Sequence, residues 1–397
     1  MQSPAERHTR KPASLRSRLL LLAAGLGIGV IAAECFLAAS GIVALSPYEQ
    51  DRVCGARLKA NYAGWQTQEG KVFVRTNSDG FRDREHAREK PAGTIRIAVL
   101  GDSYCEAMQV ELEQTFWSVM ERNLNHCLPA GSRTVEVINA GVSGYGTAQE
   151  LLTLRHRLWD YDPDIILLCV LAANDIRNNS KLLEPDQNRP FYRLKRDQLV
   201  LDATFLDNPL FASSWVRMKD QLVSRTRLGA LAYRWRHRQP AASDRREGEA
   251  GLDSFIYAPP REESQREAWR ITERLIQEIQ REVRQHDATL VIATIASGIQ
   301  VHPDASTRQA FAARFGVEEL DYADRRIEAA AGDLGCLAIT LAEPMRIYAE
   351  THHRYLHGFE DTELGTGHWN VDGHRVAGEI IARTLCRAPS FLALTAQ

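Results

Sequence analysis

The chain has no cysteine framework. Its seven cysteines among 397 residues are too scattered for a disulfide scaffold, and neither a Cys-x-x-Cys pair nor a histidine-rich metal spacing occurs. We therefore expect no metal and no other cofactor, although an oxidising compartment would leave room for one or two disulfides. The cysteines stand at positions 35, 54, 105, 127, 169, 336 and 386.

The chain also has almost no net charge. Its 49 Lys and Arg residues against 51 Asp and Glu residues leave a formal charge of −2, which gives no reason to expect a nucleic acid partner. No internal repeat is evident. The length fits a single α/β domain once the N-terminal tail, an apolar run and a polar lead segment are set aside.

Long hydrophobic runs are absent except for one near the N-terminus. Residues 19–46 are apolar apart from Glu34 and a few serines, and about 20 such residues cross a bilayer. The basic tail 1–18 should stay cytoplasmic, which places the chain after Pro47 outside the inner membrane. A charged Glu34 inside the bilayer would be unfavourable in free energy, and protonation or a shifted span would lower that cost. A cleaved signal peptide is the alternative, but the apolar run resumes after Glu34, which favours an uncleaved single-pass signal anchor.

A serine follows the first buried-strand pattern. Gly101-Asp102-Ser103 closes the apolar run 95–100 and precedes helix-compatible sequence. Reacting groups collect at the carboxyl ends of strands in parallel α/β sheets, where backbone N–H groups of a following helix can assist them. Short Gly-Asp-Ser tripeptides are also common as turns, so this signal depends on the rest of the chain.

Three later segments add polar groups of a related kind. Gly144 lies in a glycine-rich loop after the next strand pattern, and such backbone can bring N–H groups close to an oxyanion. Asn174 follows the apolar run 165–171, where its amide could serve the same purpose or form a turn with its own backbone. His368 and His374, near the C-terminus, are candidate general bases, and a structural role is the alternative for each.

Taken in order, these four blocks carry Ser, Gly, Asn and His, and the sequence resembles the SGNH (GDSL-type) hydrolase superfamily over about residues 94–386. The resemblance implies a flavodoxin-like three-layer α/β/α fold with a five-stranded, mainly parallel sheet. It implies that Ser103 is the nucleophile and His368 the base. The backbone N–H groups of Ser103 and Gly144 and the Asn174 amide would form the oxyanion hole.

The acid expected by this resemblance is missing from its usual place. Family members commonly have an aspartate two or three residues before the histidine, where this chain has Thr366 and Gly365. A backbone carbonyl could instead hold the imidazole, leaving a Ser–His dyad, and Asp372 with His374 offers a rival base pair. The candidate replacement acids are Glu363, Asp361 and Glu360.

The predicted organisation has four parts. The tail 1–18 and the transmembrane anchor 19–46 precede an extracytoplasmic lead segment 47–93, and the hydrolase domain 94–397 carries a helical insertion at about 179–260. A basic helix in the insertion could cover the site, meet anionic lipid, bind an acidic polysaccharide or present a solvated face. The five predicted strands are 95–100, 135–138, 165–171, 289–295 and 336–341.

The resemblance implies a serine esterase that acts outside the cytoplasm. Flanking stretches at 77–82 and 357–359 are similar to a bacterial, membrane-anchored and exported subgroup, which places the catalytic domain in the periplasm. We expect removal or transfer of O-acyl groups, above all O-acetyl groups, on a surface polysaccharide, with an acylated glycan or small ester as substrate. A lipase or thioesterase, which needs a long apolar cleft, is one alternative. A catalytically degenerate glycan-binding module in a polysaccharide export system is the other.

Overall fold

The computed structural model divides into two compact units. The smaller comprises Met1–Ser46 and Met218–Pro240, and the larger comprises Pro47–Arg217 and Ala241–Gln397. The predictions for residues 1–13 of the tail and for residues 237–251 of the insertion fall outside the described residues. The structure describes residues 14–40, 43, 45–129, 131, 133–236 and 252–395.

A five-stranded parallel sheet forms the centre of the larger unit, which confirms the predicted fold class. The spatial order is β11-β10-β7-β5-β6, and every neighbouring pair is parallel. The residues of β5 and β7 are all buried, as expected for strands covered on both faces. The strands are β5 (Thr94–Leu100), β6 (Thr134–Asn139), β7 (Ile165–Val170), β10 (Thr289–Thr294) and β11 (Leu337–Thr340).

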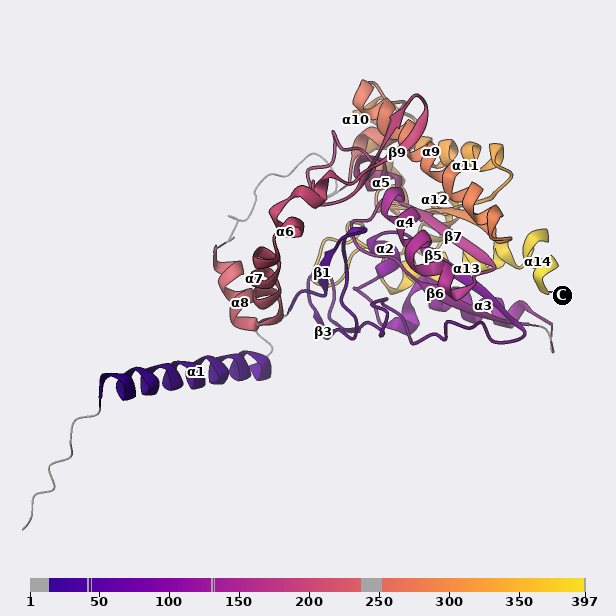
Figure 1. The fold of residues 1–397 in the computed structure, drawn as a ribbon. Helices are drawn as coiled ribbons and strands as arrows, with labels where there is room; N and C mark the ends of the chain where they lie inside the picture. Colours follow the sequence, from indigo (N-terminus) through magenta and orange to yellow (C-terminus); the bar gives the residue numbers. More distant parts are fainter. Residues whose placement is uncertain are drawn as a thin grey trace, which may run out of the picture. The chain divides into compact units, whose positions relative to one another are not determined.

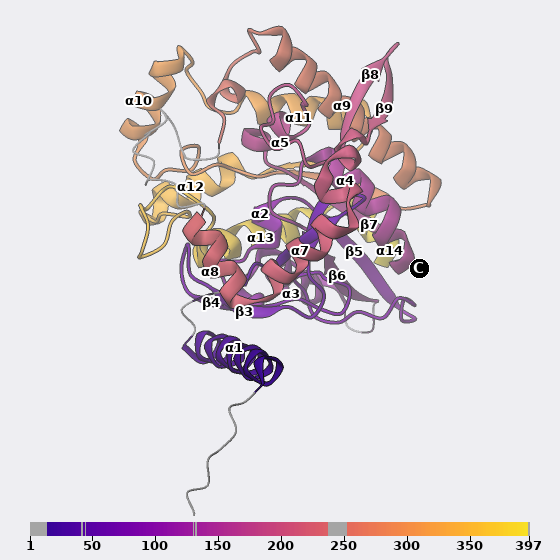
Figure 2. The ribbon, with the colours of Figure 1, turned by 60° about the vertical axis from the view of Figure 1, so that its left-hand side comes forward.

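Helices cover both faces of this sheet, as Figures 1 and 2 show. On one face α3 (Phe116–Cys127) and α13 (Val371–Leu385) pack closely against each other. The long helix α9 on the other face buries a stripe that includes Leu275, Ile279 and Val283, at the spacing of a single helix face. The helices of this second layer are α4 (Thr147–Thr153), α9 (Glu263–Gln285) and α11 (Tyr322–Asp333).

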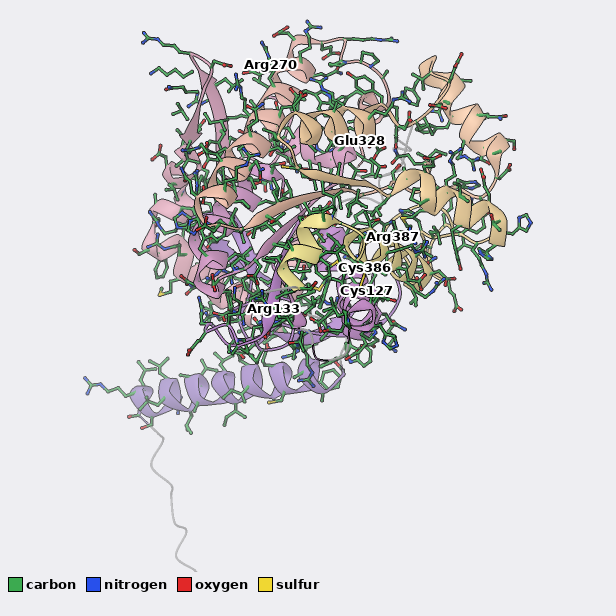
Figure 3. The ribbon with its side chains drawn as sticks, turned by 90° about the vertical axis from the view of Figure 1, so that its right-hand side faces the viewer. Cys127, Arg133, Arg270, Glu328, Cys386 and Arg387 are labelled. Atoms are coloured by element: carbon green, nitrogen blue, oxygen red, sulfur yellow. A yellow bond between two sulfur atoms is a disulfide. The ribbon has the colours of Figure 1, made fainter. Side chains whose placement is uncertain are left out.

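A disulfide fastens α3 to α13. Cys127 is the last residue of α3, Cys386 follows the last residue of α13, and the two are bonded across 259 positions of sequence (Figure 3). The other five cysteines are free thiols. The other helices in the C-terminal part of the chain are α10 (Ala305–Phe315), α12 (Ala342–His352) and α14 (Pro389–Thr395).

The lead segment packs into the larger unit. Its Phe81 side chain is buried in the core, and the buried guanidinium of Arg82 donates to the backbone carbonyls of Glu106 and Val110. The strands here are four residues long, too short for a periodic pattern to reveal them. They form two antiparallel hairpins: β1 (Tyr48–Asp51) with β2 (Gly55–Leu58), and β3 (Ala63–Gln66) with β4 (Val72–Arg75).

The insertion contains helices and, before them, an antiparallel hairpin that the sequence did not predict. Arg196 and Asp197 form the tight turn with positive φ angles of 51° and 65°. Two consecutive residues of positive φ are typical of a hairpin turn whose twist matches its strands. The helix α5 (Ala172–Asn178) comes just before the insertion, whose elements are β8 (Phe191–Lys195), β9 (Gln198–Asp202), α6 (Pro209–Ala212), α7 (Ser214–Arg225) and α8 (Arg227–Arg236).

The N-terminal apolar run forms one long helix, α1 (Leu15–Ser40), in the smaller unit. Its length of 26 residues and mean hydropathy of 2.2 over its most apolar window suffice for a membrane span by length and composition. The helix starts and ends earlier than the predicted span 19–46. Arg16 and Arg18 lie within its first turn, and the sequence places Gly41, a poor helix former, directly after its end.

Candidate active site

Ser103 and His368 meet at the carboxyl end of β5, the strand next to the central strand β7. Ser103 is the first residue of the short helix α2 (Ser103–Glu106), which begins just after β5. His368 lies in the loop that leads into α13, and its Nε2 is 2.8 Å from the Ser103 Oγ. A nucleophile within hydrogen-bond distance of a base is the arrangement that covalent acyl transfer requires.

Glu69 holds the other side of the imidazole. Its Oε2 lies 2.6 Å from His368 Nδ1 and also accepts the backbone N–H of His368 at 3.2 Å. Glu69 is in the loop between β3 and β4, in the lead segment. The three side chains therefore form a hydrogen-bonded series of carboxylate, imidazole and hydroxyl, the arrangement in which an acid fixes the tautomer of a catalytic histidine.

The electrostatics of the pair agree with this geometry. Burial alone would lower the pKa of His368, but the hydrogen bond and the charge of Glu69 outweigh burial, and the pKa of His368 is raised. Burial alone would raise the pKa of Glu69, but its contacts with His368 outweigh this, and the pKa of Glu69 is lowered. Each partner thus stabilises the charged form of the other.

The acids predicted to orient His368 are not its partners. Glu360, Asp361 and Glu363 are exposed, and the loop after them turns through positive φ angles at Gly365 and Gly367. Asp361 instead accepts the backbone N–H of Gly70 at 3.0 Å, so it holds the loop that carries Glu69. Sequence reasoning missed Glu69. Its position has no fixed spacing from His368, and the short strands on either side of it are not visible as a pattern in the sequence.

The rival pair Asp372 and His374 lies apart from the serine. Asp372 Oδ1 accepts a hydrogen bond from Arg375 at 3.2 Å. The buried His374 accepts the backbone N–H of Phe116 on its Nδ1 at 3.2 Å and stacks on the Phe116 ring. Burial lowers the pKa of His374 well below its ordinary value, which suits this acceptor role. His374 is therefore part of the packing between α3 and α13.

The Gly144 loop is fixed close to α2. Gly144 has a φ of 75°, and no atom would lie within 4 Å of an added Cβ, so backbone conformation rather than space requires glycine here. Its carbonyl accepts hydrogen bonds from Arg189 and Asn178. The peptide that follows Gly144 is therefore held in place.

Asn174 is tied to the residue before the serine. Its Nδ2 donates to Asp102 Oδ2 at 3.0 Å, and Asp102 Oδ1 accepts the backbone N–H of Tyr104, also at 3.0 Å. An amide nitrogen carries two hydrogens, so one remains for a ligand. The Asn174 Oδ1 is buried without a hydrogen-bond partner. This arrangement places the amide beside Ser103, as the sequence predicts.

Three buried carboxyl groups lie near Ser103 and Asp102. Burial raises the pKa of Glu106 to about 7, and the Tyr48 hydroxyl donates to its Oε2 at 2.7 Å. Burial and neighbouring acids raise the pKa values of Glu150 and Asp175 well above the ordinary range. Both carboxyl oxygens of Glu150 are buried without a hydrogen-bond partner. Burial therefore favours the neutral form of each of these carboxyl groups.

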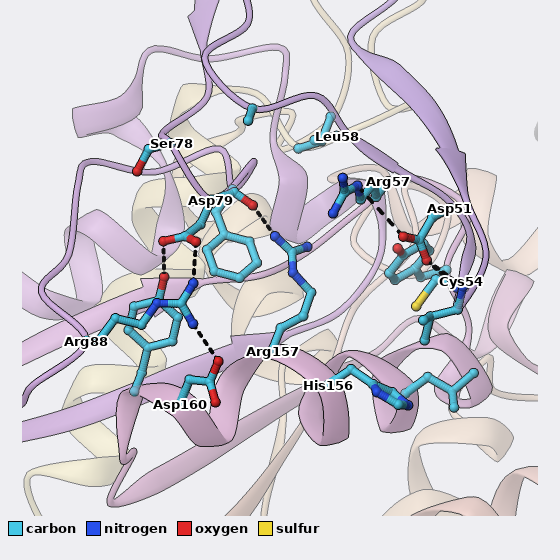
Figure 4. Close-up of a pocket in the computed structure, with 16 residues that line it drawn as sticks. Asp51, Cys54, Arg57, Leu58, Ser78, Asp79, Arg88, His156, Arg157 and Asp160 are labelled. Carbon is cyan, nitrogen blue, oxygen red and sulfur yellow. Dashed lines mark hydrogen bonds and ion pairs between the residues drawn. The ribbon is translucent and has the colours of Figure 1, made fainter. Parts of the chain in front are cut away.

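Two cavities of the larger unit differ in their relation to this site. One of about 350 Å³ is lined by the loop just before His368, from Glu363 to Thr366, together with Tyr257, His302 and Phe311. Another of about 450 Å³, shown in Figure 4, lies between the lead segment and residues 152–161, and neither Ser103 nor His368 lines it. The first cavity is lined as far as Thr366, two residues before His368 in the sequence, but neither Ser103 nor His368 lines it. In the described part of the chain no group of three His, Cys, Asp or Glu side chains is arranged to hold a metal.

Comparisons with known proteins find a family model that matches most of the chain. The model of the GDSL-like Lipase/Acylhydrolase family matches residues 99–376. Among solved structures, an acetyl xylan esterase, AlAXEase, is 14% identical with a TM-score of 0.38, covering 73% of this chain and 99% of its own. A catalytic mutant of the Geobacillus stearothermophilus acetylxylan esterase Axe2 is 11% identical with a TM-score of 0.40, covering 73% and 93%. No curated protein sequence matches the chain.

Proposed function

The chain belongs to the GDSL-like lipase/acylhydrolase family, and from that premise we propose that it is an exported serine esterase whose catalytic triad is Ser103, His368 and Glu69. The observation that carries the proposal is the continuous hydrogen-bonded series from the Glu69 carboxylate through the imidazole to the Ser103 hydroxyl. A catalytically degenerate binding module would have no use for this series.

The reaction begins with proton transfer. His368 Nε2 takes the proton of the Ser103 hydroxyl while the oxygen attacks the ester carbonyl, and Glu69 stabilises the imidazolium that forms. The tetrahedral intermediate collapses as the imidazolium gives its proton to the leaving alcohol, which leaves an acyl-serine. Water, or a sugar hydroxyl if the protein is a transferase, then attacks the acyl-serine with His368 again acting as base.

The oxyanion of each tetrahedral intermediate needs donors that are fixed in advance. We assign this role to the backbone N–H groups of Ser103 and Gly144 and to the free hydrogen of the Asn174 amide. The contacts of Asp102 with Asn174 and of Arg189 with the Gly144 carbonyl support the assignment, because they hold both donors without occupying them.

The proposed location is outside the cytoplasm, with α1 as a single-pass anchor in a bacterial inner membrane. The disulfide between Cys127 and Cys386 supports it, because disulfides persist in oxidising compartments such as the periplasm. The basic residues before α1 support the same orientation.

The proposed substrate is an O-acylated, above all O-acetylated, glycan of the cell surface. The cavity lined by the loop 363–366 supports a sugar-sized ligand, since it combines aromatic rings with polar groups and holds about 350 Å³. A lipase or thioesterase would need a long apolar cleft, and this lining of mixed polarity favours the glycan.

Hydrolysis of p-nitrophenyl esters by the full-length protein in nanodiscs tests the proposal. We expect turnover of the acetyl ester, and its loss to background in both Ser103→Ala and His368→Ala, with unchanged thermal unfolding. Equal rates in all three proteins would overturn the esterase assignment. A strong preference for long-chain over acetyl esters would favour a lipase and contradict the glycan substrate.

A further inference from the structure

Glu34 lies in the apolar helix α1, and its hydrogen-bond donors come from another helix of the smaller unit, α8. Its carboxylate accepts the backbone N–H groups of Arg227 at 2.6 Å and of Leu228 at 3.0 Å, the first two residues of α8. The next amide, of Gly229, donates to the Thr226 hydroxyl at 3.2 Å. An acid of α1 thus satisfies two of the amides that a helix start leaves without intrahelical acceptors.

The position of Glu34 along α1 sets the depth of this contact. A helix of 26 residues is about 39 Å long, against about 30 Å for the hydrocarbon core of a bilayer. Glu34 lies about 9 Å before the end at Ser40. If α1 is centred in the membrane, Glu34 therefore lies about 4–5 Å inside the hydrocarbon boundary. A carboxylate at that depth is costly unless it is paired, and its partners here belong to α8.

The helices α7 and α8 each carry a row of exposed apolar side chains. In α7 the exposed side chains of Trp215, Met218 and Leu222 share one helix face by their spacing. In α8 the exposed Leu231 and Trp235 are four residues apart and share a face as well. Exposed apolar side chains that are grouped on one helix face mark an interaction surface in many proteins.

The charge of the same segment is strongly positive. Between residues 218 and 240 the only acid is Asp220. A helix that combines exposed tryptophan and leucine with many basic residues is typical of one that lies in the membrane interface, where basic side chains meet anionic headgroups. The basic residues are Lys219, Arg225, Arg227, Arg234, Arg236 and Arg238.

We propose that the segment Met218–Arg236 lies beside α1 in the membrane–water interface on the periplasmic side of the inner membrane. Its apolar stripes would lie among the acyl chains, and the side chains of Lys219, Arg225 and Arg227 would lie among anionic phospholipid headgroups. Glu34 fixes this segment to the anchor by capping α8. The inference rests on the proposed anchoring role of α1. It explains how an acid is accommodated in the apolar helix and why the insertion exposes apolar residues.

Depth-dependent quenching in nanodiscs containing phosphatidylglycerol tests the proposal. The full-length chain, with the accessible thiols of Cys35 and Cys336 replaced by serine, receives one fluorescent label at Leu222→Cys or Leu231→Cys. Lipids carrying a quencher near the headgroup should lower the fluorescence of both labels more than lipids carrying it near the chain end. Ile347→Cys, on an equally exposed apolar side chain of α12, is the matched control and should respond to neither lipid.

A label at Leu26→Cys separates failure of the anchor from failure of this inference. Leu26 lies near the middle of α1 and should be quenched mainly by the deep lipid. If Leu26 is quenched and the labels at 222 and 231 are not, the interfacial segment is disproved while the anchor stands. If Leu26 is not quenched, the anchor itself fails and this inference with it.

Replacing Glu34 tests the link between the two helices. In Glu34→Ala the first amides of α8 lose their acceptor, so quenching of the Leu231 label by the shallow lipid should decrease. Glu34→Gln keeps one acceptor oxygen and should retain more of the quenching than alanine does. Identical quenching in the wild type and both variants would contradict the capping role, provided that circular dichroism shows the same helix content.

Discussion

The central sheet and the β3–β4 hairpin position their parts of the site by different means. Ser103 follows a strand whose seven residues are all buried, and Asn174 follows a buried strand of six. Glu69 sits in a loop between strands of four residues, in which buried and exposed positions are mixed. The buried strands therefore position Ser103 and Asn174, whereas the position of Glu69 depends on individual hydrogen bonds at Glu69 and Gly70. Local changes should disturb the hairpin far more easily than the sheet.

The largest effect that separates the two regions should come from the hairpin acid. In Glu69→Gln the histidine loses the charge that stabilises its imidazolium, and we expect turnover to fall by up to about 10⁴-fold. Glu363→Gln, which changes an exposed acid of the predicted set, is the matched control and should retain nearly full turnover. Steady-state kinetics with p-nitrophenyl acetate measure both. An equal loss in the two variants would contradict the triad.

On the sheet side, Asn174→Ala should lower turnover by about 10²–10³-fold, because it removes one oxyanion donor and leaves Ser103 and His368 in place. The loss should appear in kcat rather than in KM, since the donor acts on charge that develops in the transition state. An unchanged kcat would remove Asn174 from the oxyanion hole.

A smaller effect should follow from loosening the hairpin without touching its acid. Asp361→Ala removes the acceptor for the Gly70 N–H, so Glu69 should be less well placed, and we expect a loss of roughly 10- to 100-fold in kcat. The double variant Asp361→Ala/Glu69→Gln should lose no more than Glu69→Gln alone. Additive losses in the double variant would mean that Asp361 acts independently of Glu69.

The pH dependence should distinguish the charge of Glu69 from its geometry. His368 must be neutral to act as base, and Glu69 raises its pKa, so the acid limb of kcat/KM should lie above the ordinary histidine range. In Glu69→Gln the charged imidazole loses that stabilisation, and the limb should move to lower pH. A limb that moves to higher pH, or not at all, would show that Glu69 does not set the pKa of His368.

The smallest effect on turnover should come from the disulfide. Replacing Cys127 and Cys386 by serine should cost about 2–5 kcal/mol in the free energy of unfolding while kcat at low temperature stays near the wild-type value. Thermal unfolding and kinetics on the same preparation check both parts. If the double variant is as stable as the wild type, the packing contacts between α3 and α13 hold the two helices together without the disulfide.

The sheet was predictable because its strands are buried on both faces and appear as continuous apolar runs. Ser103, Gly144 and Asn174 each come after a strand of this sheet, and the structure brings Ser103 within hydrogen-bond distance of His368. The amphipathic stripe of α9 is visible in the sequence as well, since one helix face is buried along the helix.

The hairpins and the acid were not predictable for a related physical reason. The strands β3 and β4 are short and partly exposed, so no periodicity reveals them. The contact between Glu69 and His368 joins positions 299 apart and depends on how the lead segment packs, which local sequence does not encode. The strands of the insertion were missed as well, because five-residue strands beside a basic stretch gave a weaker signal than the helices that follow.

The bond between Cys127 and Cys386 has a consequence for a cleaved chain. A protease cut anywhere between α8 and α9 would separate Glu69, Ser103 and Asn174 on one fragment from His368 on the other. Each fragment keeps one of the two bonded cysteines. The halves of the triad would remain one molecule after such a cut, and only a reductant would let them diffuse apart.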